Sequence, residues 1–297
     1  MIYSITNGTL TARIDSLGAQ LISLRDAGET EYIWQRKAPH WENCAPILFP
    51  VVGRCRDGVI SISGIDYPMA EIHGFASSME YEVVSQTESA ITLRLSDTDY
   101  TRAKYPFAFA LDVTHKVEGG TFTTSLSVEN RSDSIMPFGI GGHPGICCPL
   151  TEGEAFTDYE LDFGKPVTLD TTCIDDDFSI SSTLTRRVVT DSQTLPLDRE
   201  LFIPDALIFE NPPFREVVFR SRKSGMGIRF GFQNFTTFAF WTETPPAEAP
   251  FLCFEPWNGM GLRSGEGTEL AEKKGSILLE PKKTFTCDYC VTPLKGV

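Results

Sequence analysis

The sequence lacks the features that mark several large protein classes. No run of about 18 apolar residues occurs in its 297 residues, so no transmembrane helix is expected. Lysine and arginine number 26 against 40 acidic residues, and the net charge of −14 disfavours nucleic acid or an anionic membrane as the main partner. The N-terminus has neither a basic start nor an apolar core, so no signal peptide is expected and the cytoplasm is favoured.

Motifs of nucleotide and metal chemistry are also absent from the sequence. There is no Gly-rich phosphate loop, no H-E-x-x-H pair and no G-x-S-x-G elbow. The four histidines, His40, His73, His115 and His143, lack the close spacing of metal ligands. We therefore expect neither a bound metal nor any other cofactor.

The eight cysteines do not form a redox or zinc motif. Six are scattered in mostly apolar company, where a free cysteine acts as a small hydrophobic residue. Cys287 and Cys290 form the one C-x-x-C spacing, but they lie in a strand pattern that points them to opposite faces. A structural role is expected for both.

What the chain has in abundance is the alternating pattern of β-strands. Residues 9–25 read as two strands around Gly18, and an E-G-G turn joins two further strands as a hairpin. Helical periodicity is confined to short turns near 40–48 and 198–202. The sequence thus predicts one antiparallel all-β domain over residues 1–297, a sandwich or distorted barrel. The other expected strands are 90–96, 107–117, 121–130, 183–190, 216–222, 227–233, 236–242, 251–257, 276–281 and 284–292.

One expected strand, F-L-C-F-E-P-W at 251–257, carries a carboxylate among apolar residues. Alternate residues of a strand share a face, so Glu255 should point the same way as Phe251 and Cys253. Burial there raises the pKa of a carboxylate, which must be paired, protonated or used. A buried Glu–Arg pair is the structural alternative to a catalytic role.

Two of the histidines stand beside glycines, which remove side-chain bulk and allow a ligand to approach. His143 lies in G-G-H-P-G and His73 in H-G-F. Imidazole exchanges protons near neutral pH, so either histidine could serve acid–base chemistry, and a turn that merely contains histidine is the alternative. His40 reads as a solvated loop residue and His115 as a satisfied strand histidine.

Three charged residues are weaker candidates for ligand binding. Arg54 and Arg56 lie in G-R-C-R-D-G, where a turn could present a guanidinium to a ligand or simply to water. Asp205, in P-D-A-L-I-F, could instead be a turn or helix-capping residue.

Taken in order, the segments GRCRDG, HGFA, GGHPGI, PDALIF and FEPWNG resemble the aldose 1-epimerase (mutarotase) superfamily. The similarity runs from about residue 10 to about residue 290 and is nearest to the shorter bacterial branch. The resemblance implies an antiparallel galactose mutarotase-like β-supersandwich with a sugar-binding groove on its concave face. The expected partner is a small-molecule aldose sugar, and the chain is expected to be a monomer or a homodimer.

The same resemblance implies roles for individual residues. Glu255 resembles the general base of the family and His143 its general acid. His73, Arg54 (or Arg56 in its place) and Asp205 resemble residues that hold the sugar. Trp257 would then offer a flat face to the sugar ring, or pack as a core residue.

Four functions remain open at this stage. An aldose 1-epimerase would interconvert the α and β anomers of a hexose by acid–base ring opening, which needs no metal or nucleotide. A hexose-6-phosphate mutarotase would also need a basic pocket, for which Arg54, Arg56 and Lys104 are loose candidates. A non-catalytic carbohydrate-binding or regulatory protein could reuse the fold. A glycosidase would use Glu255 and Asp205 as a carboxylate pair, but the G-H-P histidine argues against it.

Overall fold

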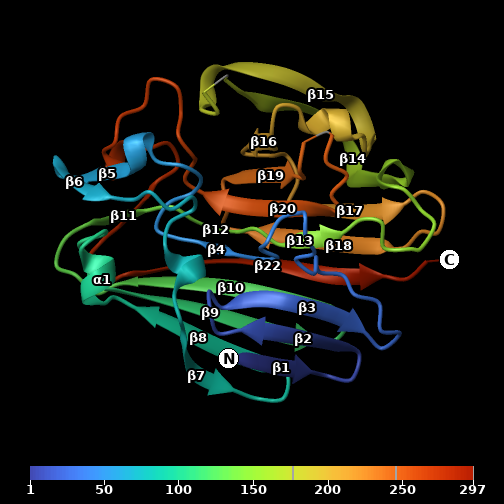
Figure 1. The fold of residues 1–297 in the computed structure, drawn as a ribbon, viewed down its shortest axis with the longest axis horizontal. Coiled ribbons are helices and arrows are strands. Elements are labelled where there is room, and N and C mark those ends of the chain that lie inside the picture. Colours follow the sequence, from blue (N-terminus) through green and yellow to red (C-terminus); the bar gives the residue numbers. More distant parts are fainter. Residues whose placement is uncertain (176, 245, 297) are drawn as a thin grey trace.

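A nine-stranded antiparallel sheet is the largest element of the computed structural model, which describes residues 1–175, 177–244 and 246–296 (Figure 1). In spatial order its strands are β15 (Ile180–Pro196), β14 (Tyr159–Ile174), β17 (Glu216–Ser221), β18 (Gly227–Gln233), β22 (Thr284–Leu294), β10 (Thr121–Asn130), β9 (Phe109–Glu118), β8 (Ala90–Ser96) and β7 (Glu82–Gln86). Most neighbours are consecutive strands, but β22 pairs with β18 on one side and with β10 on the other, so the sheet joins the two halves of the chain.

A six-stranded sheet packs against the β14–β22 part of this sheet. Aromatic rings fill the space between them: Phe230 of β18 stacks on Phe254 of β20 with ring centroids 5.1 Å apart. Such sheet-on-sheet packing buries one face of each sheet and forms the core. The strands of the six-stranded sheet are β16 (Leu207–Glu210), β19 (Thr237–Trp241), β20 (Phe251–Asn258), β12 (Ile140–Gly142) and β4 (Ile47–Leu48), with β13 (Gly145–Cys147) also paired to β20.

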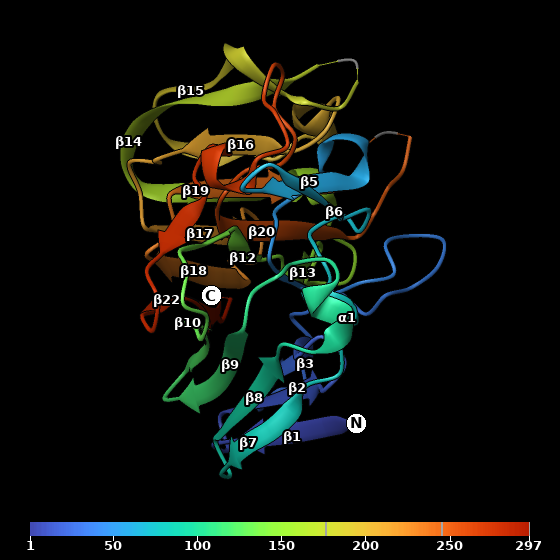
Figure 2. The same ribbon diagram turned by 90° about the vertical axis from the view of Figure 1, so that its left-hand side faces the viewer.

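A three-stranded sheet, β1 (Ile2–Thr6), β2 (Leu10–Asp15) and β3 (Gln20–Asp26), covers the β8–β10 end of the large sheet (Figures 1 and 2). His115 of β9 joins the two sheets. It is fully buried, its Nε2 lies 2.9 Å from the carbonyl oxygen of Ala19, and its Nδ1 lies 3.0 Å from Thr124 Oγ1. The expectation of a satisfied strand histidine is confirmed.

The remaining elements are short. Two strand pairs flank the six-stranded sheet, β5 (Val59–Ile62) with β6 (Ile65–Pro68) and β11 (Met136–Phe138) with β21 (Ile277–Leu279). The helical elements are α1 (Asp99–Arg102) and the 3₁₀ turns η1 (Arg56–Gly58), η2 (Ala76–Ser78), η3 (Phe156–Asp158), η4 (Arg199–Phe202) and η5 (Leu270–Glu272). Within the described residues, none of these helices has the length and apolar character needed to cross a membrane.

The antiparallel all-β prediction is confirmed, and so is the E-G-G hairpin, which joins β9 to β10. The helical turn expected at 198–202 is present as η4, whereas the one expected at 40–48 is wrong. There the backbone follows the sheet surface, and Gln20 Oε1 accepts hydrogen bonds from the backbone N–H groups of Cys44 and Ala45. Cys287 and Cys290 are free thiols, the first buried and the second partly exposed, as expected of opposite strand faces.

Candidate active site

Strand register brings His143 and Glu255 together. β20 pairs antiparallel with β12 on one side of His143 and with β13 on the other, in one continuous register. Across the short break between β12 and β13, that register sets His143 opposite Glu255. Residues directly opposite on neighbouring strands share a face, and His143 Nε2 lies 3.2 Å from Glu255 Oε1. Among the described residues, the partner of Glu255 is therefore a histidine. The structural alternative, a buried Glu–Arg pair, is wrong.

The glycines beside His143 serve packing more than access. A Cβ atom on Gly142 would run into the ring of Tyr289 on β22, and one on Gly141 would lie 2.8 Å from the Pro256 carbonyl oxygen. Side chains at either position would push β12 away from its neighbours. The glycines thus let the histidine loop lie close to β20 and the large sheet.

Burial governs the protonation of the central pair. Glu255 is 3% exposed and His143 is 6% exposed. Burial raises the pKa of Glu255 well above its usual value, and the negative charge of Asp205 adds to the rise. Burial also lowers the pKa of His143 well below its usual value, and the nearby His73 lowers it further. Both effects favour a neutral pair that holds one exchangeable proton.

His73 reaches the site from a turn held by three bonds to a neighbouring loop. Its backbone is left-handed, with φ of 68°, which costs energy for a residue other than glycine. Its N–H donates to the Gly53 carbonyl (2.8 Å), its carbonyl accepts from Phe49 N–H (3.1 Å), and its Nδ1 accepts from Gly53 N–H (3.0 Å). The ring proton must then lie on Nε2, and burial lowers the pKa of His73 to about 4. His73 is a neutral N–H donor.

The two candidate arginines have different roles. Arg54 lies in the cavity lining and is exposed. Arg56 instead donates from Nε to the Glu266 carbonyl (3.0 Å) and from Nη2 to the Arg263 carbonyl (3.2 Å), which fixes a loop. Lys104 is paired with Glu71 away from the cavity. Of the three candidate phosphate ligands, only Arg54 lines the cavity.

Asp205 enters the cavity from the loop between η4 and β16. Its Oδ1 accepts the backbone N–H of Ala206 at 2.9 Å, a turn contact of the kind expected for this residue. Burial raises the pKa of Asp205, while that N–H bond and the positive charge of Arg54 oppose the rise. The side chain therefore combines a local turn contact with a position in the cavity wall.

Aromatic rings surround the imidazole of His143. Trp41 is tilted by 31° against it with centroids 4.8 Å apart, and Trp241 meets it edge-on at 5.7 Å. Glu243 holds the Trp41 loop, since it accepts the Trp41 N–H at 2.7 Å and lies 2.6 Å from His40 Nδ1. His40 thus anchors a loop and is not simply solvated. Neither tryptophan was identified from the sequence. Trp41 lies in the 40–48 segment, which was expected to form a helical turn, and Trp241 was recognised only as part of the expected strand 236–242.

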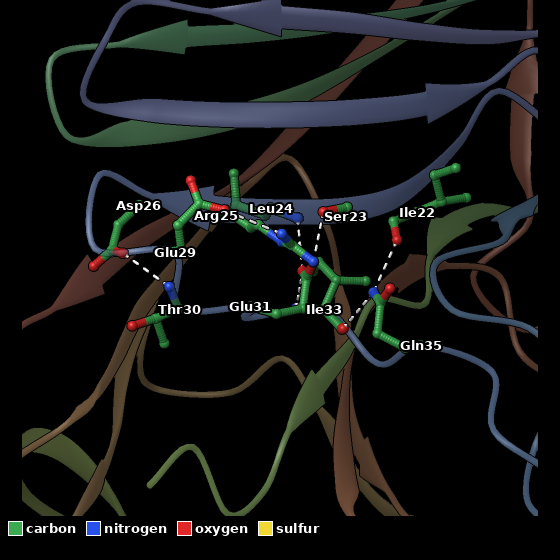
Figure 3. Close-up of polar contacts among 10 residues, drawn as sticks. All are labelled: Ile22, Ser23, Leu24, Arg25, Asp26, Glu29, Thr30, Glu31, Ile33 and Gln35. Atoms are coloured by element: carbon green, nitrogen blue, oxygen red, sulfur yellow. Dashed lines mark hydrogen bonds and ion pairs between the residues drawn. The ribbon is translucent and has the colours of Figure 1, made fainter.

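A polar network ties β3 of the N-terminal sheet to the segment that follows it, residues 29–35 (Figure 3). Glu31 accepts hydrogen bonds from Leu24 N–H (2.9 Å), Ile33 N–H (3.1 Å), Ser23 Oγ (2.5 Å) and Arg25 Nε (3.1 Å). The segment that it anchors pairs in turn with β13, through the Trp34 N–H and the Gly145 carbonyl at 2.9 Å. Glu31 therefore supports the strand that follows His143.

One cavity of about 270 Å³ brings together all the predicted site residues: Arg54, His73, His143, Asp205, Glu255 and Trp257. Trp257 is 5% exposed and packs in a small apolar cluster, and its Nε1 has no partner among the described residues. It thus belongs both to the core and to the cavity wall. Other residues of the cavity lining, among them Ile72 and Phe178, were not identified from the sequence.

His143, Cys253 and Glu255 could together hold a metal ion, since their ligand atoms lie within 4.8 Å of one another. Nitrogen, sulfur and oxygen donors of this kind suit zinc, although the ligands would have to move closer. The grouping was not expected from the sequence, because it joins a residue between β12 and β13 to two residues of β20. An ion there would occupy both members of the proposed proton-transfer pair.

Comparison with known proteins identifies the family of the chain. The sequence profile described as aldose 1-epimerase matches residues 1–271. The chain belongs to the aldose 1-epimerase family. The chromosomal and plasmid forms of protein LacX from Lactococcus lactis are each 31% identical to it over 303 residues, which cover 99% of this chain and 100% of LacX.

Solved structures share the mutarotase-like fold of this family member. A galactose mutarotase related enzyme from Lactobacillus acidophilus superimposes with a TM-score of 0.94 at 31% identity, covering 100% of this chain and 98% of that one. A galactose mutarotase-like protein from Lactobacillus casei gives 0.92 at 26% identity, covering 99% and 100%. The family and these neighbours support a mutarotase-type function, and the fold prediction is confirmed.

Proposed function

We propose that this chain is an aldose 1-epimerase that interconverts the α and β anomers of a neutral hexose at His143 and Glu255. The observation that carries the proposal is the 3.2 Å contact between His143 Nε2 and Glu255 Oε1 at a cavity also lined by His73, Arg54 and Asp205. An acid and a base held this close can act on the ring oxygen and the anomeric hydroxyl of one sugar.

In the proposed reaction, Glu255 as carboxylate takes the proton of the anomeric hydroxyl. The bond between C1 and the ring oxygen breaks, its electron pair goes to the ring oxygen, and protonated His143 gives a proton to that oxygen. The open-chain aldehyde turns about the C1–C2 bond. Closure on the other face returns one proton to His143 and one to the anomeric oxygen.

The proton count of the pair suits this scheme. The neutral pair and the ion pair of His143 and Glu255 hold the same number of protons. Each ring opening converts the ion pair into the neutral pair, and each ring closure restores the ion pair. Burial favours the neutral pair, so the hydroxyls of a bound sugar must help to stabilise the charged form. His73 Nε2–H and Arg54 are donors available in the cavity for binding sugar oxygens.

The charges of the cavity favour a neutral sugar over a phosphorylated one. Its lining holds one cationic residue, Arg54, and two carboxyl residues, Asp205 and Glu255. A phosphate group would gain one guanidinium but would be repelled by the carboxylate form of Asp205, and by that of Glu255 whenever this side chain acts as the base. A hexose-6-phosphate mutarotase is therefore the second candidate, supported only by the exposed Arg54.

The test is anomer exchange measured by NMR saturation transfer, on glucose, galactose and glucose 6-phosphate at equal concentrations. We expect the protein to accelerate exchange of a neutral hexose more than that of the phosphate. A large advantage for the phosphate would favour the second candidate. Sugar binding without accelerated exchange would indicate a non-catalytic protein, and release of the aryl group from an aryl glycoside would indicate a glycosidase.

A further inference from the structure

Two large apolar side chains stand exposed at the edge of the cavity. Ile72 is 51% exposed and Phe178 is 58% exposed, and both belong to the cavity lining. Other apolar lining residues, such as Ile180 and Ile208, are buried. An exposed aromatic ring beside a binding cavity is costly in water and is well suited to cover part of a ligand.

The backbone conformation at Phe178 indicates that the exposed ring has a function. Its φ of 60° is left-handed, a conformation that glycine adopts freely and a bulky side chain adopts at a cost. The turn is closed by hydrogen bonds from Phe178 N–H to the Asp175 carbonyl (2.9 Å) and from Asp175 N–H to the Ser179 carbonyl (2.8 Å). The chain thus places phenylalanine where the turn itself favours glycine.

The part of the chain next to Phe178 is held in place from outside the hairpin. Ile180 N–H donates to the Leu262 carbonyl at 2.7 Å, and Ser264 N–H donates to the Ile180 carbonyl at 3.0 Å. The hydroxyls of Ser179 and Ser264 lie 3.0 Å apart. Because Leu262 also lines the cavity, these bonds fix the Phe178 turn relative to the sugar site.

We propose that Phe178 and Ile72 form a second subsite that packs on the apolar face of a second pyranose ring, so that reducing disaccharides are preferred substrates. The first ring lies in the polar cavity, with its anomeric carbon at His143 and Glu255. The second ring is joined through a hydroxyl remote from that carbon, so the anomeric hydroxyl stays free. The C–H groups of a pyranose ring make one face apolar, which suits an aromatic platform. This inference rests on the proposed function.

The test compares each monosaccharide with disaccharides that carry it at the reducing end. Anomer exchange of glucose is measured beside that of maltose, cellobiose and melibiose, for the parent protein and for Phe178→Gly. For one or more of the disaccharides, we expect the parent to have a kcat/KM at least about tenfold higher than for glucose. A tenfold ratio corresponds to a free-energy difference of about 1.4 kcal/mol. Phe178→Gly should bring the ratio of kcat/KM for that disaccharide to kcat/KM for glucose down to about one, and should not lower Tm, because glycine fits the turn.

Leu184→Ala is the matched control. Leu184 is 60% exposed on β15, the strand that follows the Phe178 turn, but lies outside the cavity, so its removal should leave every ratio unchanged. The proposal is overturned if the parent does not distinguish disaccharides from glucose, or if Phe178→Gly retains the preference. If no sugar is turned over, the proposed function fails. The subsite is then tested by measuring the affinities for the same sugars by calorimetry. Equal affinity for glucose and the disaccharides would then overturn it.

Discussion

His143 and Glu255 are each less than a tenth exposed, and burial favours the uncharged form of both side chains. The sequence already indicated this for Glu255, because its neighbours along the strand are apolar. The strand pattern could not indicate that the partner would be His143, which only the family resemblance assigned to the same site, since the contact depends on the register between β20 and two short strands distant in sequence. Local pattern predicts burial, whereas partners depend on the tertiary fold.

A metal prediction follows from the grouping of His143 and Glu255 with Cys253. Anomer exchange should survive EDTA, because the proposed acid–base scheme uses no ion. Added Zn²⁺ should inhibit, since an ion held by these ligands would block both proton-transfer groups. Cys253→Ala should weaken the inhibition, and Cys290→Ala, on the outer face of β22, should not. Loss of exchange in EDTA that one added metal restores would contradict the scheme.

Single elements differ in how much of them could be predicted. β8, β10 and β18 begin and end where their alternating pattern does. β14 was missed, because its middle holds Gly164 and Pro166, which usually interrupt a strand. The structure accommodates them in an irregularity between Asp162 and Val167, where the register with β15 shifts. The hairpin that carries Phe178 to the cavity was therefore not visible as a unit.

Glu31 gives a stability prediction for the element that it anchors. Its side chain is 16% exposed and accepts backbone hydrogen bonds from Leu24 and Ile33. Glu31→Ala would leave those N–H groups unpaired, so we expect the free energy of unfolding to fall by about 1–3 kcal/mol in urea denaturation. The control is Glu29→Ala. Its side chain is 78% exposed and pairs with Arg25, so the expected loss is below about 1 kcal/mol. Equal losses would contradict the anchoring role.

Across the whole molecule, buried histidines connect stability to pH. Burial lowers the pKa of His73 and His115 to about 4 and that of His143 well below its usual value. Each takes up a proton more readily when the chain unfolds. Their contribution to stability is therefore present above about pH 6.5 and is lost as the pH falls towards 4. Glu255, with its raised pKa, acts in the opposite direction.

The contribution of a buried histidine to the pH dependence of stability can be measured separately at His115, because His115 lies outside the cavity. Between about pH 6 and 4.5 it should contribute a slope of about 1.4 kcal/mol per pH unit. We expect His115→Gln to be less stable at pH 7 but to lose that part of the slope when urea unfolding is measured at several pH values. A slope equal to that of the parent would contradict neutral burial of His115.

The single-domain prediction also belongs to the whole molecule. The main hydrophobic cluster contains residues from Ile5 to Val291, and the nine-stranded sheet combines strands from both halves of the chain. We therefore expect one unfolding transition, with coincident midpoints by tryptophan fluorescence and far-UV circular dichroism. Two separate midpoints would indicate two folding units. A monomeric or homodimeric state and a cytoplasmic location also remain predictions.

The central claim, that His143 and Glu255 move the protons of ring opening, is tested most directly by Glu255→Gln. Because burial favours the protonated carboxyl, glutamine resembles the resting side chain in shape and charge, and the fold should be retained. We expect anomer exchange to fall by about 10²-fold or more, while Tm and sugar affinity change little. His143→Asn should also lose exchange, and Glu160→Gln, in the large sheet outside the cavity, should not. A Glu255→Gln protein that melts like the parent and still equilibrates anomers at the parental rate would contradict the account.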